Sequence, residues 1–348
     1  MNIIYQPYYY WTGHFKQYAD SLLANDDILI KPRRNITYRG FLSYCILRFY
    51  YSMINLIKVK YITTKKLPDK VFILDFEPLS ILLLNRFIFN KNISYIITIH
   101  AIQMNDYKSF LKNKVAQFQR TLLKLALIKI NKSFNCKFIV HTEAHKKQLS
   151  NFIGKNDFYI SVIDYPAPEP ISKIEDFQID LYSPIKLLIF GTIRPDKGLF
   201  EFIESVKNSQ LDEYIKITIA GKVMDERFRN YIPAKNVEII DRFLQDFELN
   251  TIVSNCHFFL VPYAKNYTGG AGPAKDATSY GKPVIVSNLD IFKEFSQKDF
   301  VYIINEPDDL IKIINDLTPI KYKLSCLSSL EYSRNNNWTT LRDRYNAL

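Results

Sequence analysis

The stretch IKLLIFGTIRPDKG, residues 185–198, places a run of apolar residues directly before a glycine-containing turn. The apolar run predicts a strand buried on both faces, and a helix is expected from about residue 199 to 208. Free backbone N–H groups and the helix dipole make such a turn suitable for an anion. Arg194 and Lys197 add two fixed cations, which suits a diphosphate. Taken alone, the pattern favours an ordinary strand-to-helix turn.

A second glycine-rich turn follows another apolar run, residues 258–261. It contains TGGAGP, residues 268–273, and precedes a helix that we expect to end near Tyr280. Because ligands of open α/β sheets bind beyond the carboxyl ends of the strands, two such turns can converge on one diphosphate. Asp276, one turn into this helix, is then placed to accept hydrogen bonds from a ribose diol. A solvated carboxylate near the helix dipole is the alternative for this residue.

Short apolar runs bounded by turn or charge signals recur along the whole chain. Helical patterns lie between them, which indicates βαβ units and parallel sheets, an α/β fold. The predicted strands are 2–6, 27–30, 71–74, 95–99, 137–140 and 159–163 in the first half, and 185–190, 215–220, 237–240, 258–261, 283–286 and 301–303 in the second. Four prolines fall between the two sets. We therefore expect a first domain at 1–165, a linker at 166–184, a second domain at 185–330 and a terminal helix at 331–348.

The net charge of +11 belongs entirely to the first half of the chain. Residues 1–180 hold 25 Lys and Arg against 14 Asp and Glu, whereas residues 181–348 hold 21 of each. A positive field attracts phosphate-rich partners such as nucleic acid, anionic lipid or a lipid-phosphate substrate. Residues 31–70 contain ten Lys and Arg with one acid, and residues 107–137 contain eight with none.

The second basic tract also has apolar residues at helical spacing. These are Leu111, Val115, Phe118, Leu122 and Leu125. The pattern fits either a helix docked at a membrane interface or a core helix with a solvated basic face. The charge of the whole half favours an anionic membrane.

Composition excludes several other classes of protein. Hydrophobic residues make up 47% and charged residues 23%, as in globular proteins. No apolar run approaches the ~18 residues that span a bilayer. The four cysteines form no CxxC pair and are expected to be buried thiols in a reducing compartment. Without a zinc-finger or RNA-binding signature, we expect no nucleic-acid partner despite the basic charge.

Four motifs together resemble a known family. FGTIRPDKG (190–198) resembles the donor-binding loop of GT-B glycosyltransferases, family 4 in particular, and ATSYGKPVI (277–285) resembles the end of that family's E-x7-E motif. IAGK (219–222) and LVPY (260–263) match further landmarks in order and spacing. The resemblance covers residues 185–287 well and the first half weakly. It implies the GT-B fold, two Rossmann-like domains whose parallel sheets face each other across a cleft.

The E-x7-E motif itself is altered. By spacing, its two glutamates fall on Thr268 and Asp276, which we keep as candidates for the donor ribose or sugar. Thr268 supplies no carboxylate, so the neighbouring glycines are expected to offer backbone N–H groups to the phosphate. The predicted donor diphosphate residues are Gly13, Gly191, Arg194, Lys197, Gly269, Gly270, Ala271 and Gly272.

The resemblance also implies roles in the first half. In GT-B enzymes the loop after the first strand faces the cleft, where Gly13 would admit a donor phosphate and His14 would contact either substrate. His100 follows the strand 95–99 and resembles the family 4 histidine that contacts the donor sugar near the reacting carbon. Imidazole is also suited to carry a proton near neutral pH. We predict His100 and His14 as catalytic and treat the other three histidines, His141, His145 and His257, as structural.

The expected protein is therefore a glycosyltransferase of hexosyltransferase type. It would move a sugar, with retention, from a UDP-sugar or GDP-sugar to a lipid-linked oligosaccharide or polysaccharide, as in bacterial cell-surface glycan synthesis. No cofactor is expected, and no metal, because the chain contains no Asp-x-Asp triplet. The expected location is cytoplasmic, peripheral at the inner face of the plasma membrane. A sugar-nucleotide epimerase of the same fold and a catalytically inactive GT-B scaffold remain alternatives.

Overall fold

The computed structural model divides the chain into two compact units. The first contains residues 1–165 and 338–348, and the second contains residues 166–337. Each unit is built on a six-stranded sheet in which all pairs are parallel, so the predicted α/β fold of two Rossmann-like units is confirmed. The structure describes residues 1–11, 14–34, 39–100, 110–133, 135–154, 159–171, 177–207, 209, 211, 213–265, 267, 272–293 and 295–348.

The sheet of the first unit has the strand order β2-β1-β3-β4-β5-β6. Its strands are apolar and mostly buried on both faces, as a sheet covered by helices requires. Their bounds are β1 Ile3–Tyr5, β2 Ile28–Ile30, β3 Lys70–Ile73, β4 Ser94–Thr98, β5 Cys136–Val140 and β6 Ile160–Val162. Because side chains alternate along a strand, Ile3 and Tyr5 enter one core while Ile4 enters the other.

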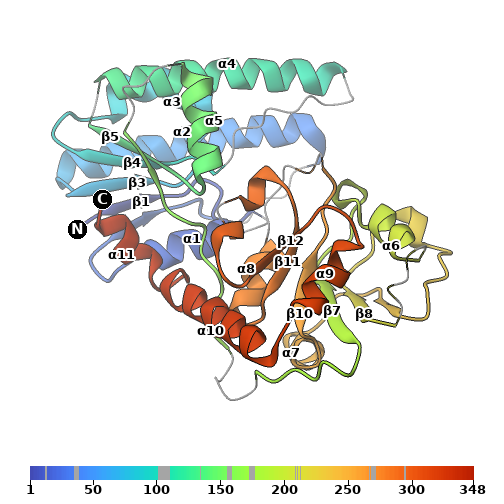
Figure 1. Ribbon diagram of the computed structural model, residues 1–348. Coiled ribbons are helices and arrows are strands. Elements are labelled where there is room, and N and C mark those ends of the chain that lie inside the picture. Colours follow the sequence, from blue (N-terminus) through green and yellow to red (C-terminus); the bar gives the residue numbers. More distant parts are fainter. Residues whose placement is uncertain are drawn as a thin grey trace. The chain divides into compact units, whose positions relative to one another are not determined.

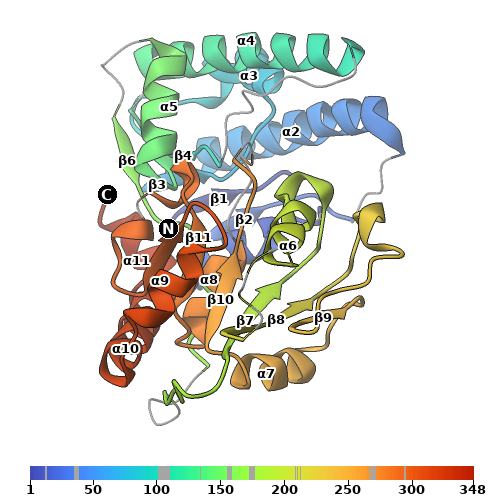
Figure 2. The same cartoon turned by 45° about the vertical axis from the view of Figure 1, so that its right-hand side comes forward.

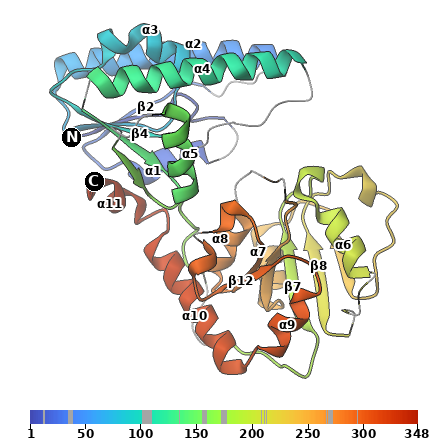
Figure 3. The same ribbon diagram turned by 45° about the horizontal axis from the view of Figure 1, so that its top comes forward.

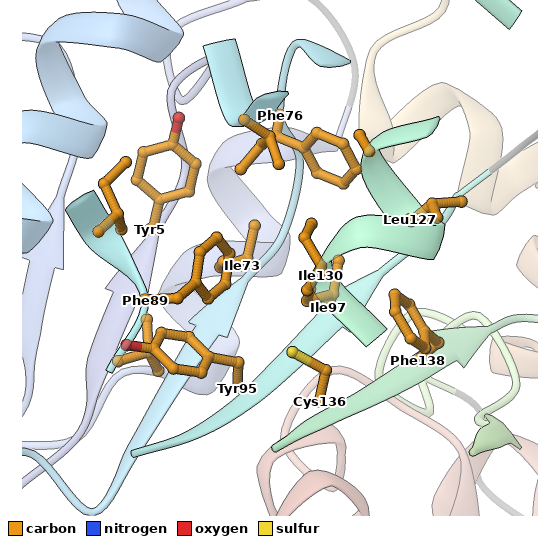
Figure 4. Packing of buried hydrophobic residues seen from close by; sticks show 14 of the residues in the cluster. Tyr5, Ile73, Phe76, Phe89, Tyr95, Ile97, Leu127, Ile130, Cys136 and Phe138 are labelled. Atoms are coloured by element: carbon orange, nitrogen blue, oxygen red, sulfur yellow. The ribbon is translucent and has the colours of Figure 1, made fainter. Parts of the chain in front are cut away.

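Four helices cover one face of this sheet and two cover the other (Figure 1). The four are α2 (Gly40–Lys65), α3 (Pro78–Ile88), α4 (Phe110–Ser133) and α5 (Glu143–Ile153). Figure 4 shows part of the core beneath them, where Leu127 and Ile130 of α4 lie over Ile97 and Phe138 of the sheet. The opposite face carries α1 (Phe15–Leu22) and α11 (Leu341–Asn346).

The chain's final residues differ from the expected single terminal helix. A long helix, α10 (Pro319–Asn335), ends in the second unit, and a separate helix, α11, begins at Leu341 in the first. The run of asparagines at 335–337 explains the break, because asparagine side chains compete for backbone hydrogen bonds. Asn337 is buried and donates from its amide to the Arg334 carbonyl. In α11, the hydroxyl of Tyr345 bonds those of Tyr18 and Thr98, which anchors the segment.

The sheet of the second unit has the order β12-β11-β10-β7-β8-β9 (Figure 2). Its strands are β7 Ile185–Phe190, β8 Ile215–Ala220, β9 Val237–Ile240, β10 Phe258–Val261, β11 Val284–Ser287 and β12 Val301–Ile304. The helices besides α10 are α6 (Leu199–Lys207), α7 (Asp246–Ser254), α8 (Gly272–Ser279) and α9 (Asp309–Asn315). The strand order reverses between β7 and β10, and the carboxyl ends at such a switch point are where ligands of open α/β sheets bind.

The segment expected as a linker packs onto the second unit over its described part. The Ile171 N–H donates to the Ser279 carbonyl at 2.7 Å, and Phe177 lies in the core. The Phe177 ring fills the space where a side chain at Gly281 would be, since a Cβ there would lie 2.4 Å from it. Gly281 also has φ +62°, so two independent constraints favour glycine there.

Candidate functional site

The turns that follow β7 and β10 meet at the switch point of the second unit. The Ala264 N–H donates to the Lys197 carbonyl at 2.8 Å. Gly198 lies at φ +71°, and a Cβ there would stand 2.5 Å from that of Ala264. This glycine is therefore needed for the close approach of two backbones rather than for contact with a phosphate.

Gly191 has a different environment. A Cβ at this position would meet its nearest neighbours, Pro273 Cγ and Lys197 Nζ, only at 3.7 and 3.9 Å. Pro273 lies in the first turn of α8, so the turn after β7 and the start of α8 are adjacent. The structure thus brings the described parts of both predicted glycine-containing loops together.

Lys197 is the partly buried cation of this site. Its ammonium lies 5.3 Å from the centre of the Tyr263 ring, and it makes no ion pair with any described residue. Burial, assisted by the charge of Arg194, lowers the pKa of Lys197 to about 8. Lys197 and Tyr263 line a narrow pocket, whose walls are Ile189, Phe190, Ile193, Lys197, Leu199, Leu260, Val261, Pro262, Tyr263 and Pro273. A half-buried, unneutralised cation in a pocket is an arrangement that an anion would stabilise.

Arg194, the second predicted cation, is already engaged. Both oxygens of Asp196 accept hydrogen bonds from its guanidinium at 3.0 Å. The two side chains are about half exposed, at 47% and 56%. An anionic ligand would have to compete with Asp196 for this guanidinium, so Arg194 is the weaker of the two predicted contacts.

Asp276 and Tyr263 complete the polar groups at the switch point. Burial raises the pKa of Asp276 to about 6, and no described residue pairs with its carboxylate. The Tyr263 hydroxyl is buried, also lacks a hydrogen-bond partner among the described residues, and lies within electrostatic range of Arg194 and Asp276. Buried polar groups normally have partners, so these two point to a ligand with hydroxyl or phosphate groups. Tyr263 was not predicted as a site residue, although it ends the LVPY motif.

Other predicted donor residues have a less defined place. Gly13, Thr268, Gly269, Gly270 and Ala271 lie outside the described residues. Gly272 begins α8 with open space around it. Within the described part of the chain, no three His, Cys, Asp or Glu side chains are grouped as a metal site requires.

In the first unit, His100 forms a pair with a histidine that we expected to be structural. Nδ1 of His100 lies 2.9 Å from Nε2 of His141, and Nδ1 of His141 lies 3.0 Å from the Ile163 carbonyl. A carbonyl only accepts, so His141 carries its proton on Nδ1, and in the neutral pair His100 donates from Nδ1. This leaves a lone pair on Nε2 of His100. That atom is buried and has no hydrogen-bond partner among the described residues. Burial lowers the pKa of His100, and the charge of Asp75 and the backbone of Leu74 oppose this in part.

His14 lies at the edge of the same group of rings. It is exposed, stacks on Trp338 with ring centres 5.9 Å apart, and lies 5.7 Å from Tyr165. Tyr165 also contacts His100 and His141. The two predicted catalytic histidines therefore share an aromatic neighbour. By contrast, Nδ1 of His257 accepts from the Lys186 N–H at the amino end of β7.

Comparison with known proteins agrees with this geometry. Residues 172–322 match the model of the family "Glycosyl transferases group 1", and this stretch lies wholly within the second unit. No curated protein matches the chain. The solved structure of TarM is 14% identical, with a TM-score of 0.54, and the match covers 84% of this chain but only 58% of TarM.

Two further solved structures match over nearly their whole length. A glycosyltransferase from Rickettsia africae ESF-5 is 12% identical, with a TM-score of 0.63 and coverage of 99% of this chain and 96% of that one. The lipopolysaccharide outer core galactosyltransferase WaaB is 12% identical, with a TM-score of 0.64 and coverage of 99% and 98%. These likenesses confirm the GT-B fold, and together with the family match they support a glycosyltransferase.

Proposed function

We propose that this chain is a retaining, metal-independent glycosyltransferase of hexosyl type, with a UDP-sugar or GDP-sugar as donor. The observation that carries the proposal is the switch point of the second unit. There Lys197, Tyr263 and Asp276 present a cation, a hydroxyl and a carboxylate that no described residue satisfies. A nucleoside diphosphate has a complementary group for each of them.

The donor would be held by charge and by backbone geometry together. Lys197 neutralises the diphosphate, and Arg194 joins it when its pairing with Asp196 is given up. The turns before α6 and α8 add backbone N–H groups at helix starts. Asp276 accepts hydrogen bonds from the ribose. These groups stabilise the negative charge that develops on the leaving diphosphate, which is the role that a metal ion plays in other transferases.

His100 would act on the donor sugar. Its free Nε2 lone pair can accept a hydrogen bond or a proton from a sugar hydroxyl. His141 is a positioning residue, because its bond to Nδ1 fixes which nitrogen of His100 is free. We keep His14 as the second candidate for substrate contact, since it shares Tyr165 with His100.

The acceptor we propose is a lipid-linked oligosaccharide or polysaccharide used in bacterial surface glycan synthesis, at the cytoplasmic face of the plasma membrane. The support is electrostatic. The first unit holds 26 Lys and Arg against 11 Asp and Glu, which suits an acceptor presented on phosphate at an anionic surface.

Nucleotide binding tests the proposal most directly. UDP, GDP, ADP and CMP should be compared by thermal shift, and we expect UDP or GDP to raise the melting temperature of the wild-type protein and to raise that of Lys197→Ala less at the same concentration. The preferred nucleotide then selects sugar donors for a transfer assay. No shift with any of the four would contradict the proposal. Binding without sugar transfer to any lipid-linked acceptor would indicate a scaffold instead.

A further inference from the structure

Three helices of the first unit expose a shared outer surface. The inner sides of α2, α3 and α4 pack on the same face of the sheet, through residues such as Leu56, Ile81 and Leu127. Neighbouring helices in this layer are in contact, and they lie side by side in Figures 1 and 3. Their opposite sides therefore point away from the sheet in a common direction. We call these opposite sides the outer helical face.

The outer helical face is rich in large apolar side chains. Nine of them are between 47% and 73% exposed, and within each helix they are four or seven residues apart, which is one or two helical turns and places them in stripes. They are Leu42, Ile46, Tyr50, Ile57 and Tyr61 on α2, Leu83 and Phe87 on α3, and Phe118 and Leu125 on α4. Large exposed apolar side chains gathered on one face in this way are typical of an interaction site.

The same face is positively charged. The sequence of the three helices contains eleven Lys and Arg and no Asp or Glu. The charges lie among the apolar side chains, since the Lys60 ammonium is 5.5 Å from the Phe87 ring centre and the Lys65 ammonium is 4.3 Å from that of Tyr61. Exposed cations of the face are Lys65, Arg86, Lys114, Lys129 and Lys132.

The structure also separates the two interpretations of α4 that the sequence left open. Its core side consists of Ala116, Ala126, Leu127 and Ile130. Phe118 and Leu125, from the stripe found in the sequence, are 60% and 52% exposed. They lie on the outer side with Lys114 and Lys129. Phe118 and Leu125 are thus available to a partner and are not on the side that builds the core.

We propose that the outer helical face docks the protein on an anionic lipid membrane. This rests on the proposed function, because a lipid-linked acceptor is presented at such a surface. Lipid supplies both complements, anionic headgroups for the cations and acyl chains for the exposed apolar residues. Nucleic acid would match the cations but leave the apolar stripes in water. Among the described residues no helix is long and apolar enough to cross a bilayer, so docking would be at the surface.

Cosedimentation of the full chain with vesicles tests the proposal. We expect binding to vesicles of phosphatidylglycerol and phosphatidylcholine in equal parts, much weaker binding to phosphatidylcholine alone, and a marked loss at high salt. The triple variant Lys114→Gln, Lys129→Gln, Lys132→Gln should bind anionic vesicles at least tenfold more weakly. The double variant Phe118→Ser, Leu125→Ser should do the same, and because these side chains are exposed it should fold normally.

The second unit supplies matched controls. Lys298→Gln, Lys321→Gln, Lys323→Gln removes three exposed cations there, and Phe243→Ser, Phe247→Ser removes two exposed rings at 73% and 71%. Both should leave vesicle binding unchanged. Loss of binding in the controls but not in the α4 variants would overturn the proposal, as would equal binding to both vesicle types or none to either at low salt.

Two other outcomes would assign the face to a different partner. A dimer seen by light scattering and lost in Phe118→Ser, Leu125→Ser would make it an interface between copies, and salt-dependent binding to duplex DNA as tight as to vesicles would make it a nucleic-acid surface. Either result overturns the proposal. Nucleotide binding measured on the same variants should be unchanged. Absence of nucleotide binding in the wild type would instead contradict the proposed function while leaving the vesicle result intact.

Discussion

Each of the two units is built on its own six-stranded parallel sheet, but the units differ in net charge and in the residues at the strand ends. The first holds 26 Lys and Arg against 11 Asp and Glu, whereas the second holds 20 against 24. The glycine turns with Lys197 nevertheless lie in the second unit, while histidines and aromatic rings occupy the first. A binding site for a diphosphate therefore depends on a few local cations, and net charge instead indicates which larger surface the unit can meet.

The largest effect is expected on kcat from a variant of the first unit, which is proposed to act in sugar transfer, whereas the second unit is proposed to bind the nucleotide. His100→Ala should lower kcat at least about a hundredfold, the range for loss of a proton-transferring group, and leave nucleotide affinity unchanged. His141→Asn should lower kcat less and alter its pH profile, because it removes the group that orients His100. Steady-state kinetics and nucleotide titration would measure both. His145→Asn, in the same unit, is the control; an equal loss there would remove the special role of His100.

Nucleotide affinity should respond to the second unit. Lys197→Ala should weaken binding of the preferred nucleoside diphosphate at least about tenfold, since a charge-assisted bond contributes about 1.5–3 kcal/mol. Arg194→Ala should cost less, because Asp196 already engages the guanidinium. Lys222→Ala is the matched control, as this lysine stands after the neighbouring strand β8 and pairs with Asp241. Equal losses at Lys197 and Lys222 in calorimetric titrations would show that the switch point is not the site.

The pH dependence of nucleotide binding should follow the protonation of Lys197. Its pKa is lowered to about 8, so the cation that binds phosphate is mostly lost between pH 7 and pH 9. Affinity should therefore fall about tenfold over that interval, following the charged fraction. Lys197→Arg keeps its charge and should give a nearly flat profile. A profile for Lys197→Arg as steep as that of the wild type would assign the pH dependence to another group.

Asp276→Asn should weaken nucleotide binding and stabilise the folded protein at high pH. Burial raises the pKa of Asp276 from 3.8 to about 6, because the folded protein favours the protonated carboxyl. The contribution of this group to the free energy of unfolding is therefore largest below about pH 4 and is lost as the pH rises through 6. At pH 8 the buried charge costs up to about 3 kcal/mol. The variant should melt at a higher temperature at pH 8, show little difference at pH 4, and bind nucleotide several-fold more weakly. Asp299→Asn, at an exposed carboxylate, should change neither quantity.

Chelation should have the smallest effect. Side chains and helix N-termini of the second unit are proposed to neutralise the diphosphate of the donor, so sugar transfer should continue unchanged in excess EDTA. Complete loss of activity, restored by manganese, would mean that Lys197 and its neighbours do not suffice for the leaving diphosphate.

Continuous apolar runs made the strands predictable. All twelve predicted strands are present, and each begins and ends within one residue of the prediction. Periodicity alone could not identify the outer side of α4, because both sides of that helix carry apolar residues. The break at 336–340 was missed, although three successive asparagines signal it. The pairing of His100 with His141 depends on β4 and β5 being neighbours, which strand order decides and local sequence does not.

The placement of residues 338–348 has a consequence for how the protein is made. Trp338, Leu341 and Tyr345 complete a core in which Tyr18 and Phe72 are translated more than 250 residues earlier. During synthesis the contiguous second unit can close its core while the first still lacks α11, which reverses the usual N-terminal-first order. A fragment cut at residue 165 would leave the face that carries α1 without α11 and Trp338, so part of that core would be uncovered. A fragment of residues 166–337 would instead contain the whole of the second unit.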